Sequence, residues 1–92
     1  MKSVIQHEKE CWVCGKTTNL HDHHIFFGTS NRKQSEKYGM KVWLCQEHHT
    51  GNEGVHFNKI LDTTLKKTAQ EHFETTFGNR ERFREFFGKS YL

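Results

Sequence analysis

The chain has 92 residues, of which 33% are hydrophobic and 27% charged, so its core must be thin. Such small domains commonly need a disulfide or a metal ion to fold. The net charge of +3 suits a polyanionic partner without identifying one. No apolar stretch approaches the roughly 18 residues of a membrane span, and no secretory signal pattern opens the chain. We therefore expect a soluble, cytoplasmic protein with no membrane partner.

The first predicted element is a metal-binding knuckle at Cys11 and Cys14, which are separated by two residues. Gly15 follows directly, where a tight turn often needs a positive φ. The chain has three cysteines, and an odd number argues against a framework made purely of disulfides. In a reducing compartment such a pair favours metal binding, and a redox-active pair is the alternative.

A short strand or hairpin is expected next, over residues 19–27. This element ends in an apolar run, and Gly-Thr-Ser follows it. Ser30 is the expected N-cap of a short helix over 31–38, and Gly39 is the residue expected to end that helix.

Residues 41–44 predict a second strand that runs directly into Cys45. A helix should begin near Gln46, although two later glycines disfavour its continuation.

The C-terminal part, residues 59–92, is predicted to be a helical extension. Apolar side chains recur there at spacings of three and four, which is typical of one helix face. The predicted stripe consists of Leu61, Leu65, Ala69, His72, Phe73 and Phe77. Gly78 is expected at the end of this helix and Asn79 at the N-cap of a final helix through Phe87.

Cys45 and His48 form a second pair with the same two-residue spacing as Cys11 and Cys14. Two such pairs can converge tetrahedrally on Zn²⁺, and four protein ligands would make the zinc structural. The alternative is that Cys45 is a buried strand residue and His48 an ordinary surface histidine.

The remaining histidines cluster near these pairs, as His21, His23, His24, His49 and His56. Histidine suits metal binding and proton transfer because its ordinary pKa is about 6.5. In a strand, neighbouring side chains point to opposite faces, so adjacent histidines would face different surroundings.

The order of these motifs resembles HNH-type nucleases, the ββα-metal or His-Me finger family, and in particular small phage and prophage members with a structural zinc. The resemblance rests on Cys-x-x-Cys at 11–14, His-His-Ile at 23–25, Leu-Cys-Gln-Glu-His-His-Thr-Gly at 44–51 and Gly-Val-His at 54–56. It covers roughly residues 8–58. It implies an α+β fold in which a ββα-metal, treble-clef-like zinc module precedes the C-terminal helices, within a single domain over 1–92.

The resemblance also implies a metal-dependent endonuclease that hydrolyses phosphodiester bonds in DNA. His24 matches the general base that activates the attacking water, and His23 and His49 match ligands of a catalytic Mg²⁺ or Mn²⁺. His56 matches a later histidine that contacts metal or phosphate, although from the residues alone it could also cap a helix or replace His48 at the zinc. The family's central asparagine has no secure match in this sequence, with Asn31 and Asn52 as the two candidates.

Basic residues on the short helix are candidates for phosphate contacts, namely Arg32, Lys33 and Lys37. A solvated helix face explains each of them equally well.

Two other functions remain open at this point. A treble-clef-like zinc module could bind nucleic acid or protein without cleaving, with His23 and His24 merely stabilising the fold. An accessory subunit could dock through its aromatic helical tail onto a second copy or a phage or recombination protein, although core packing is the better default for those aromatic residues. The histidines that are not among the four predicted zinc ligands favour the nuclease, because a module that only binds has no need for them.

Overall fold

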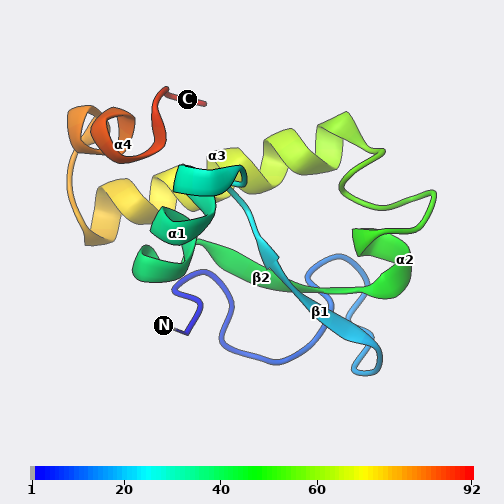
Figure 1. The fold of residues 1–92 in the computed structure, drawn as a ribbon. Helices are drawn as coiled ribbons and strands as arrows, with labels where there is room; N and C mark the ends of the chain where they lie inside the picture. The colour runs from blue at the N-terminus through cyan, green and yellow to red at the C-terminus, as the bar shows by residue number, and fades with distance from the viewer. Residues whose placement is uncertain (1) are drawn as a thin grey trace.

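The computed structural model describes residues 2–92 as an α+β fold with a two-stranded antiparallel sheet and four helices. The strands are β1 (Leu20–His24) and β2 (Lys41–Cys45). The helices are α1 (Thr29–Tyr38), α2 (Gln46–His49), α3 (Lys59–Thr76) and α4 (Arg80–Phe87). In Figure 1, α3 runs along one side of the sheet, with α2 near one end of the molecule and α1 and α4 near the other.

The sheet register determines which functional side chains share a face. His21 pairs with Leu44 and His23 with Val42, so these four side chains share the inner face. Asp22 pairs with Trp43 and His24 with Lys41, and these point outward. Val42, Leu44 and His23 are buried, whereas Asp22 is exposed. The two adjacent histidines of β1 therefore face different surroundings, as strand alternation predicts.

β1 is shorter than the expected element over 19–27. It ends at His24, and Ile25 and Phe26 turn into the core, where both are almost completely buried. Phe26 is held there by Ser35 of α1, whose hydroxyl accepts from the Phe26 amide at 3.1 Å and donates to its carbonyl at 2.8 Å. Ile25 and Phe26 are thus core rather than strand, whereas Phe27, the last residue of the apolar run, is exposed.

α1 begins earlier than expected. Its N-cap is Gly28, without a side-chain cap, and the prediction of Ser30 as N-cap is wrong because the Arg32 amide donates to the Gly28 carbonyl and starts the helix before Ser30. The predicted end is confirmed, since Gly39 is the C-cap with φ 68°.

α4 confirms the predicted cap at Asn79, and α3 has a cap at Asn58 that was not predicted. The side chains of Asn58 and Asn79 accept hydrogen bonds from Leu61 N at 3.0 Å and Arg82 N at 2.9 Å, respectively. The buried stripe of α3 comprises Leu65, Ala69, Gln70 and Phe73. Of the other predicted stripe residues, Leu61 and His72 are half-buried and Phe77 is exposed.

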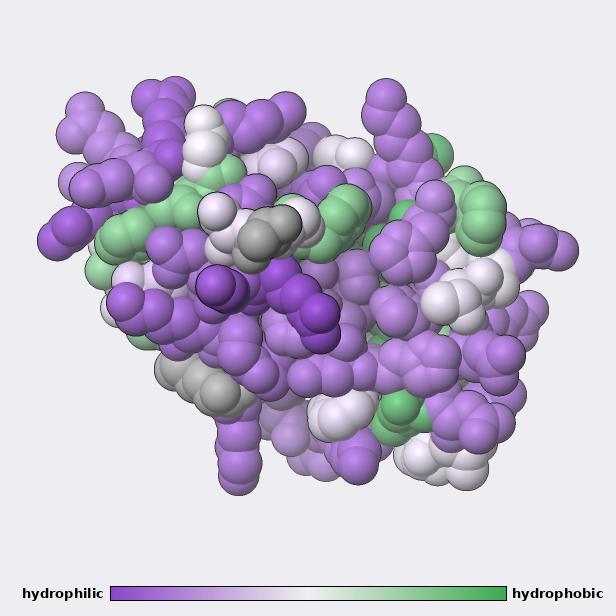
Figure 2. Space-filling model, viewed as in Figure 1, coloured by the Kyte–Doolittle hydropathy of each residue, from purple (hydrophilic) through white to green (hydrophobic). Residues whose placement is uncertain are grey.

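The C-terminal helices form the core together with the sheet. Phe26 contacts Phe83 and Phe87 with ring centroids 5.2 and 4.6 Å apart, and Phe73 lies 5.4 Å from Phe83. These aromatic side chains therefore pack inside the molecule. Figure 2 shows a mainly hydrophilic surface on the face seen, with scattered hydrophobic patches. Across residues 2–92, no helix has the length and hydrophobicity needed to cross a membrane.

Candidate metal centres

The first candidate centre joins the two predicted ligand pairs. Cys11, Cys14, Cys45 and His48 offer ligand atoms that all lie within 4.8 Å of one another. The first pair sits in a tight turn in which the Gly15 amide donates to the Cys11 carbonyl, and Gly15 has φ 78°. The second pair lies where β2 ends and α2 begins. These four residues could bind one metal ion.

The distances fit a tetrahedral ion. A zinc with bonds of about 2.3 Å to sulfur and 2.0–2.1 Å to nitrogen separates two sulfurs by about 3.8 Å and sulfur from nitrogen by about 3.6 Å. The Sγ atoms of Cys14 and Cys45 are 3.9 Å apart. His48 Nδ1 lies 3.2 Å from Cys45 Sγ and 3.7 Å from Cys11 Sγ. The donor set and its spacing are therefore consistent with structural zinc.

The backbone around Cys11 favours a thiolate. Burial raises the pKa of this thiol, but hydrogen bonds from the backbone at Cys45, Cys14 and Val13 outweigh burial and lower the pKa to about 6. The thiolate is the form that ligates a metal.

The second candidate centre consists of His23, His49 and His56, whose candidate ligand nitrogens also lie within 4.8 Å of one another. The ring centroid of His23 is 5.2 Å from that of His49 and 5.8 Å from that of His56. His23 comes from β1, His49 from α2 and His56 from the following loop. The structure thus assigns His48 to the cysteines and His56 to the histidines, against the alternative in which His56 replaces His48.

The imidazole of His23 has a buried nitrogen without a partner in the described part of the chain, which points to a bound ligand. Its side chain is 3% exposed, and Nε2 is the buried side-chain polar atom without a hydrogen-bond partner in residues 2–92. Leaving a buried polar atom unpaired costs about 1–3 kcal/mol, so such an atom calls for an explanation. A metal ion between the three rings would satisfy it.

The three rings are also suited to bind a cation as neutral ligands. Burial, followed by the nearby His49 and His56, lowers the pKa of His23 to about 3. Burial also lowers the pKa of His49, with His56 and His21 adding to the effect. A neutral imidazole keeps the lone pair that a metal needs.

The loop that carries His56 is closed by close backbone contacts. The Val55 amide donates to the His48 carbonyl at 2.8 Å, and the Val55 side chain is buried. A Cβ on Gly54 would lie 2.8 Å from the carbonyl oxygens of Gly51 and His49. This loop therefore requires glycine at position 54 to return His56 to the other two histidines.

His21 was not among the predicted site residues, yet it contacts the second centre. Its Nδ1 lies 2.8 Å from His49 Nδ1, so one of these nitrogens donates a hydrogen bond to the other. Because Nδ1 of His49 is used in this contact, Nε2 is the nitrogen of His49 that could bind a metal. The signal was present in the sequence, because His21 and His23 lie two residues apart on one strand.

His24, the predicted general base, lies on the outer face of the sheet. Its Nε2 is 3.9 Å from Glu36 Oε2, and it lines a shallow cleft with Glu36, Gly28, Arg32 and Lys33. The structure therefore brings His23, His49 and His56 together but places His24 on the other side of β1. Its catalytic role stays a prediction.

Asp22, His24 and Glu36 also lie close enough together to share an ion. However, Lys41 Nζ lies 2.7 Å from Glu36 and 3.3 Å from Asp22. Because this ammonium already supplies positive charge to both carboxylates, we do not treat the group as a metal centre.

The predicted phosphate-binding residues lie on exposed positions of α1. Arg32 and Lys33 line the cleft of His24, whereas Lys37 lies against the ring of Tyr38, with Nζ 5.5 Å from the ring centroid. Asn31 is half-buried in α1 and Asn52 is exposed in the loop after α2. Which of the two fills the family's central position stays a prediction.

Comparison with known proteins adds no relative: no protein family, no curated protein and no solved structure matches this chain. The geometry of the two candidate centres is therefore the basis for inferring the function.

Proposed function

We propose that this protein is a metal-dependent endonuclease of the HNH, ββα-metal type that hydrolyses phosphodiester bonds in DNA. The observation that carries the proposal is the convergence of His23, His49 and His56 around the unpaired Nε2 of His23. In this proposal Cys11, Cys14, Cys45 and His48 hold a structural zinc that stabilises the fold. Three protein ligands leave coordination positions for water and phosphate, as in catalytic metal sites generally.

The donor set bears on which divalent ion the histidine centre would hold. Mg²⁺ strongly prefers oxygen ligands, whereas imidazole suits later first-row transition metals such as Fe²⁺, Ni²⁺ and Zn²⁺, and Mn²⁺ stands at the weak-binding end of that series. Of the two ions suggested by the resemblance, Mn²⁺ therefore fits three imidazoles better than Mg²⁺. When bound, such an ion would stabilise negative charge on the phosphate and on the leaving 3′ oxygen.

His24 is the proposed general base. It would take a proton from the attacking water as the oxygen–phosphorus bond forms and the bond to the 3′ oxygen breaks. The departing oxygen takes a proton from solvent, which leaves a 3′ hydroxyl and a 5′ phosphate. Glu36, 3.9 Å from His24 Nε2, would orient the ring. His23 and His24 are the last two residues of β1, and their side chains point to opposite faces of the sheet. The scissile phosphate would therefore have to lie at the end of β1, within reach of both side chains.

Arg32 and Lys33 support this arrangement because they line the same cleft as His24. Their positive charges would hold the phosphates next to the scissile one. Such contacts give affinity without sequence preference, and they weaken as salt rises.

A plasmid nicking assay tests the proposal. Zinc-loaded protein is incubated with supercoiled plasmid and with Mn²⁺, Mg²⁺ or no added ion, beside His23→Ala, His24→Ala and the control His72→Ala. We expect Mn²⁺-dependent nicking that falls at least 100-fold in the first two variants and stays within threefold in the control. Each variant must retain one zinc, which shows that it is folded.

Equal nicking by wild type and His23→Ala under every condition would refute the nuclease and leave a non-catalytic zinc module. Loss of activity in His23→Ala but not in His24→Ala would refute only the role of His24.

A further inference from the structure

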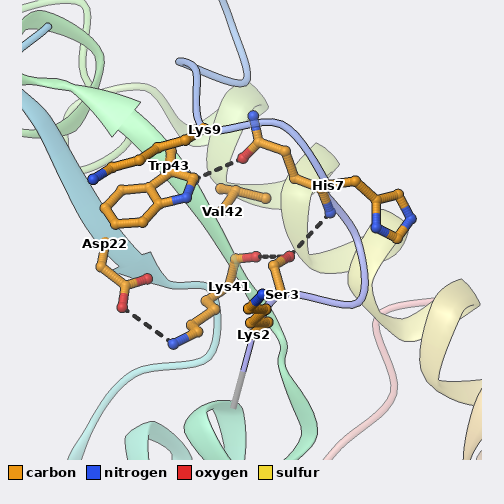
Figure 3. A pocket seen from close by; sticks show the side chains of 9 residues that line it. Lys2, Ser3, His7, Lys9, Asp22, Lys41, Val42 and Trp43 are labelled. Atoms are coloured by element: carbon orange, nitrogen blue, oxygen red, sulfur yellow. Dashed lines mark hydrogen bonds and ion pairs between the residues drawn. The ribbon is translucent and has the colours of Figure 1, made fainter. Parts of the chain in front are cut away.

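The outer face of the sheet carries a cleft that the proposed nuclease does not use. It has a volume of about 740 Å³ and lies between the N-terminal segment and β2. Ligand sites in proteins commonly span about 300–1,000 Å³, which is enough for one or two nucleotides. Its lining includes the charged and aromatic side chains of Lys2, Lys9, Asp22, Lys41 and Trp43 (Figure 3).

The cleft is a fixed part of the fold because the N-terminal segment is tied to the free edge of β2. The Trp43 amide donates to Gln6 Oε1 at 2.8 Å, and the Ser3 hydroxyl donates to the Lys41 carbonyl. Further along, the Trp12 amide donates to the Trp43 carbonyl at 2.8 Å. These bonds satisfy the strand edge and hold the first lysines beside the sheet.

The charge of the cleft favours an anion. Lys41 is paired with Asp22, as Figure 3 shows, and with Glu36. Lys2 and Lys9, by contrast, form no ion pair within residues 2–92. Two lysines without a carboxylate partner therefore line the same wall.

Trp43 adds an aromatic surface to the cleft that these lysines line. Lys9 extends along the indole in Figure 3, with Nζ 4.8 Å from the ring centroid. Lys9 is exposed, so the ring face is covered by a flexible side chain that a ligand can displace. A base stacked on an aromatic ring beside lysines is the usual arrangement in proteins that bind single-stranded nucleic acid.

We propose that this cleft binds a single-stranded segment of nucleic acid, with one base stacked on Trp43 and the flanking phosphates on Lys2 and Lys9. Lys41 connects it to the cleft of His24, because Lys41 and His24 are cross-strand partners and both approach Glu36. A single-stranded nucleic acid bound on Trp43 would thus run toward His24. This direction of the nucleic acid rests on the proposed function, whereas its binding to the cleft does not.

Binding is measured by fluorescence anisotropy with a labelled 12-nucleotide oligo-dT and with a duplex of the same length. The zinc-loaded protein is used without Mn²⁺ or Mg²⁺, so that cleavage does not interfere. Trp43→Leu should weaken oligo-dT binding about 5- to 100-fold, because it removes one stacked base, while Trp43→Phe should stay within about threefold.

The lysines are tested by salt dependence. Each phosphate contact on a single strand contributes about 0.7 to the slope of log affinity against log salt. Lys2→Ala/Lys9→Ala should therefore reduce that slope by about 1.4, while the control Lys67→Ala, an exposed lysine of α3, leaves it unchanged.

Three results would overturn the proposal: equal binding by Trp43→Leu and wild type, an equal loss in Lys67→Ala and the double variant, or tighter binding of the duplex than of oligo-dT. If Trp43→Leu fails to retain zinc, the double lysine variant decides the outcome alone. Oligo-dT binding that is weakened in Trp43→Leu, without any plasmid nicking, would refute the proposed nuclease and support this cleft, whereas nicking with normal oligo-dT binding by Trp43→Leu would do the reverse.

Discussion

The buried, unpaired His23 predicts a specific loss of stability in acid. Its pKa is about 3 in the folded protein, because burial and the neighbouring His49 and His56 disfavour the charged ring, and about 6.5 in the unfolded chain. Between these values the unfolded chain binds one proton more than the folded protein. Folding stability therefore falls as pH falls from about 6.5 towards 3.

The size of this loss follows from the two pKa values. Each pH unit within the window costs about 1.4 kcal/mol for one proton. Between pH 7 and pH 5, about 1.5 pH units lie below the unfolded-state pKa of 6.5. Over that interval His23 should lower the free energy of unfolding by about 2 kcal/mol. A domain stability of about 5–15 kcal/mol makes such a loss easy to measure.

The assay is urea denaturation of zinc-loaded wild type and His23→Leu at pH 7 and pH 5, with no other divalent ion. Leucine fills a similar volume and does not titrate. Both proteins keep the four candidate zinc ligands, so the difference between the two proteins reports on His23 and its contacts with His49 and His56. Wild type should lose about 2 kcal/mol more than the variant between the two pH values. An equal loss in both proteins would show that His23 is protonated in the fold and would refute the reasoning.

Two further predictions concern the two centres. Cys45→Ser should abolish tight zinc binding and unfold the chain, because a structural zinc contributes about 10–16 kcal/mol in peptide systems; circular dichroism and metal analysis measure this, and a folded variant with no zinc would contradict it. Gly54→Ala should weaken Mn²⁺ binding at least tenfold with one zinc retained, because its Cβ would lie 2.8 Å from two carbonyl oxygens and shift the loop of His56. Calorimetric titration tests the second prediction with Thr50→Ala as control, and unchanged affinity would show that the loop adapts.

Local signals predicted much of this fold. Asn79 was recognisable as an N-cap because it precedes a helical apolar pattern, and its side chain bonds the amide three residues ahead. The matched spacing of two cysteine–ligand pairs likewise predicted a cluster that the structure contains. In both cases the information lies within a few residues, or in two short motifs that one ion can join.

Features that depend on distant packing escaped prediction. Ser30 was expected to cap α1, but the preceding chain turns into the core through Phe26 and Ser35, and the helix begins before it. The Trp43 cleft exists because Gln6 bonds the edge of β2, and no pattern in the sequence encodes that contact. Strand alternation did separate His23 from His24, but only the register showed that Glu36 and Lys41 lie on the side of His24.

The adjacency of His48 and His49 links the two metal centres physically. α2 has four residues, none of them buried, and an isolated helix of this length is not stable. Its orientation is fixed by the contact of His48 Nδ1 with Cys45 Sγ at 3.2 Å and by the contact between His49 and His21, together with the Gln46 amide, which donates to the Asn19 carbonyl. The two centres share no ligand, yet zinc bound through His48 would hold the neighbouring His49 towards His23. If the proposed function holds, zinc at the first candidate centre is a precondition for metal binding at the second, and loss of zinc should remove Mn²⁺ binding even where the three histidines are intact.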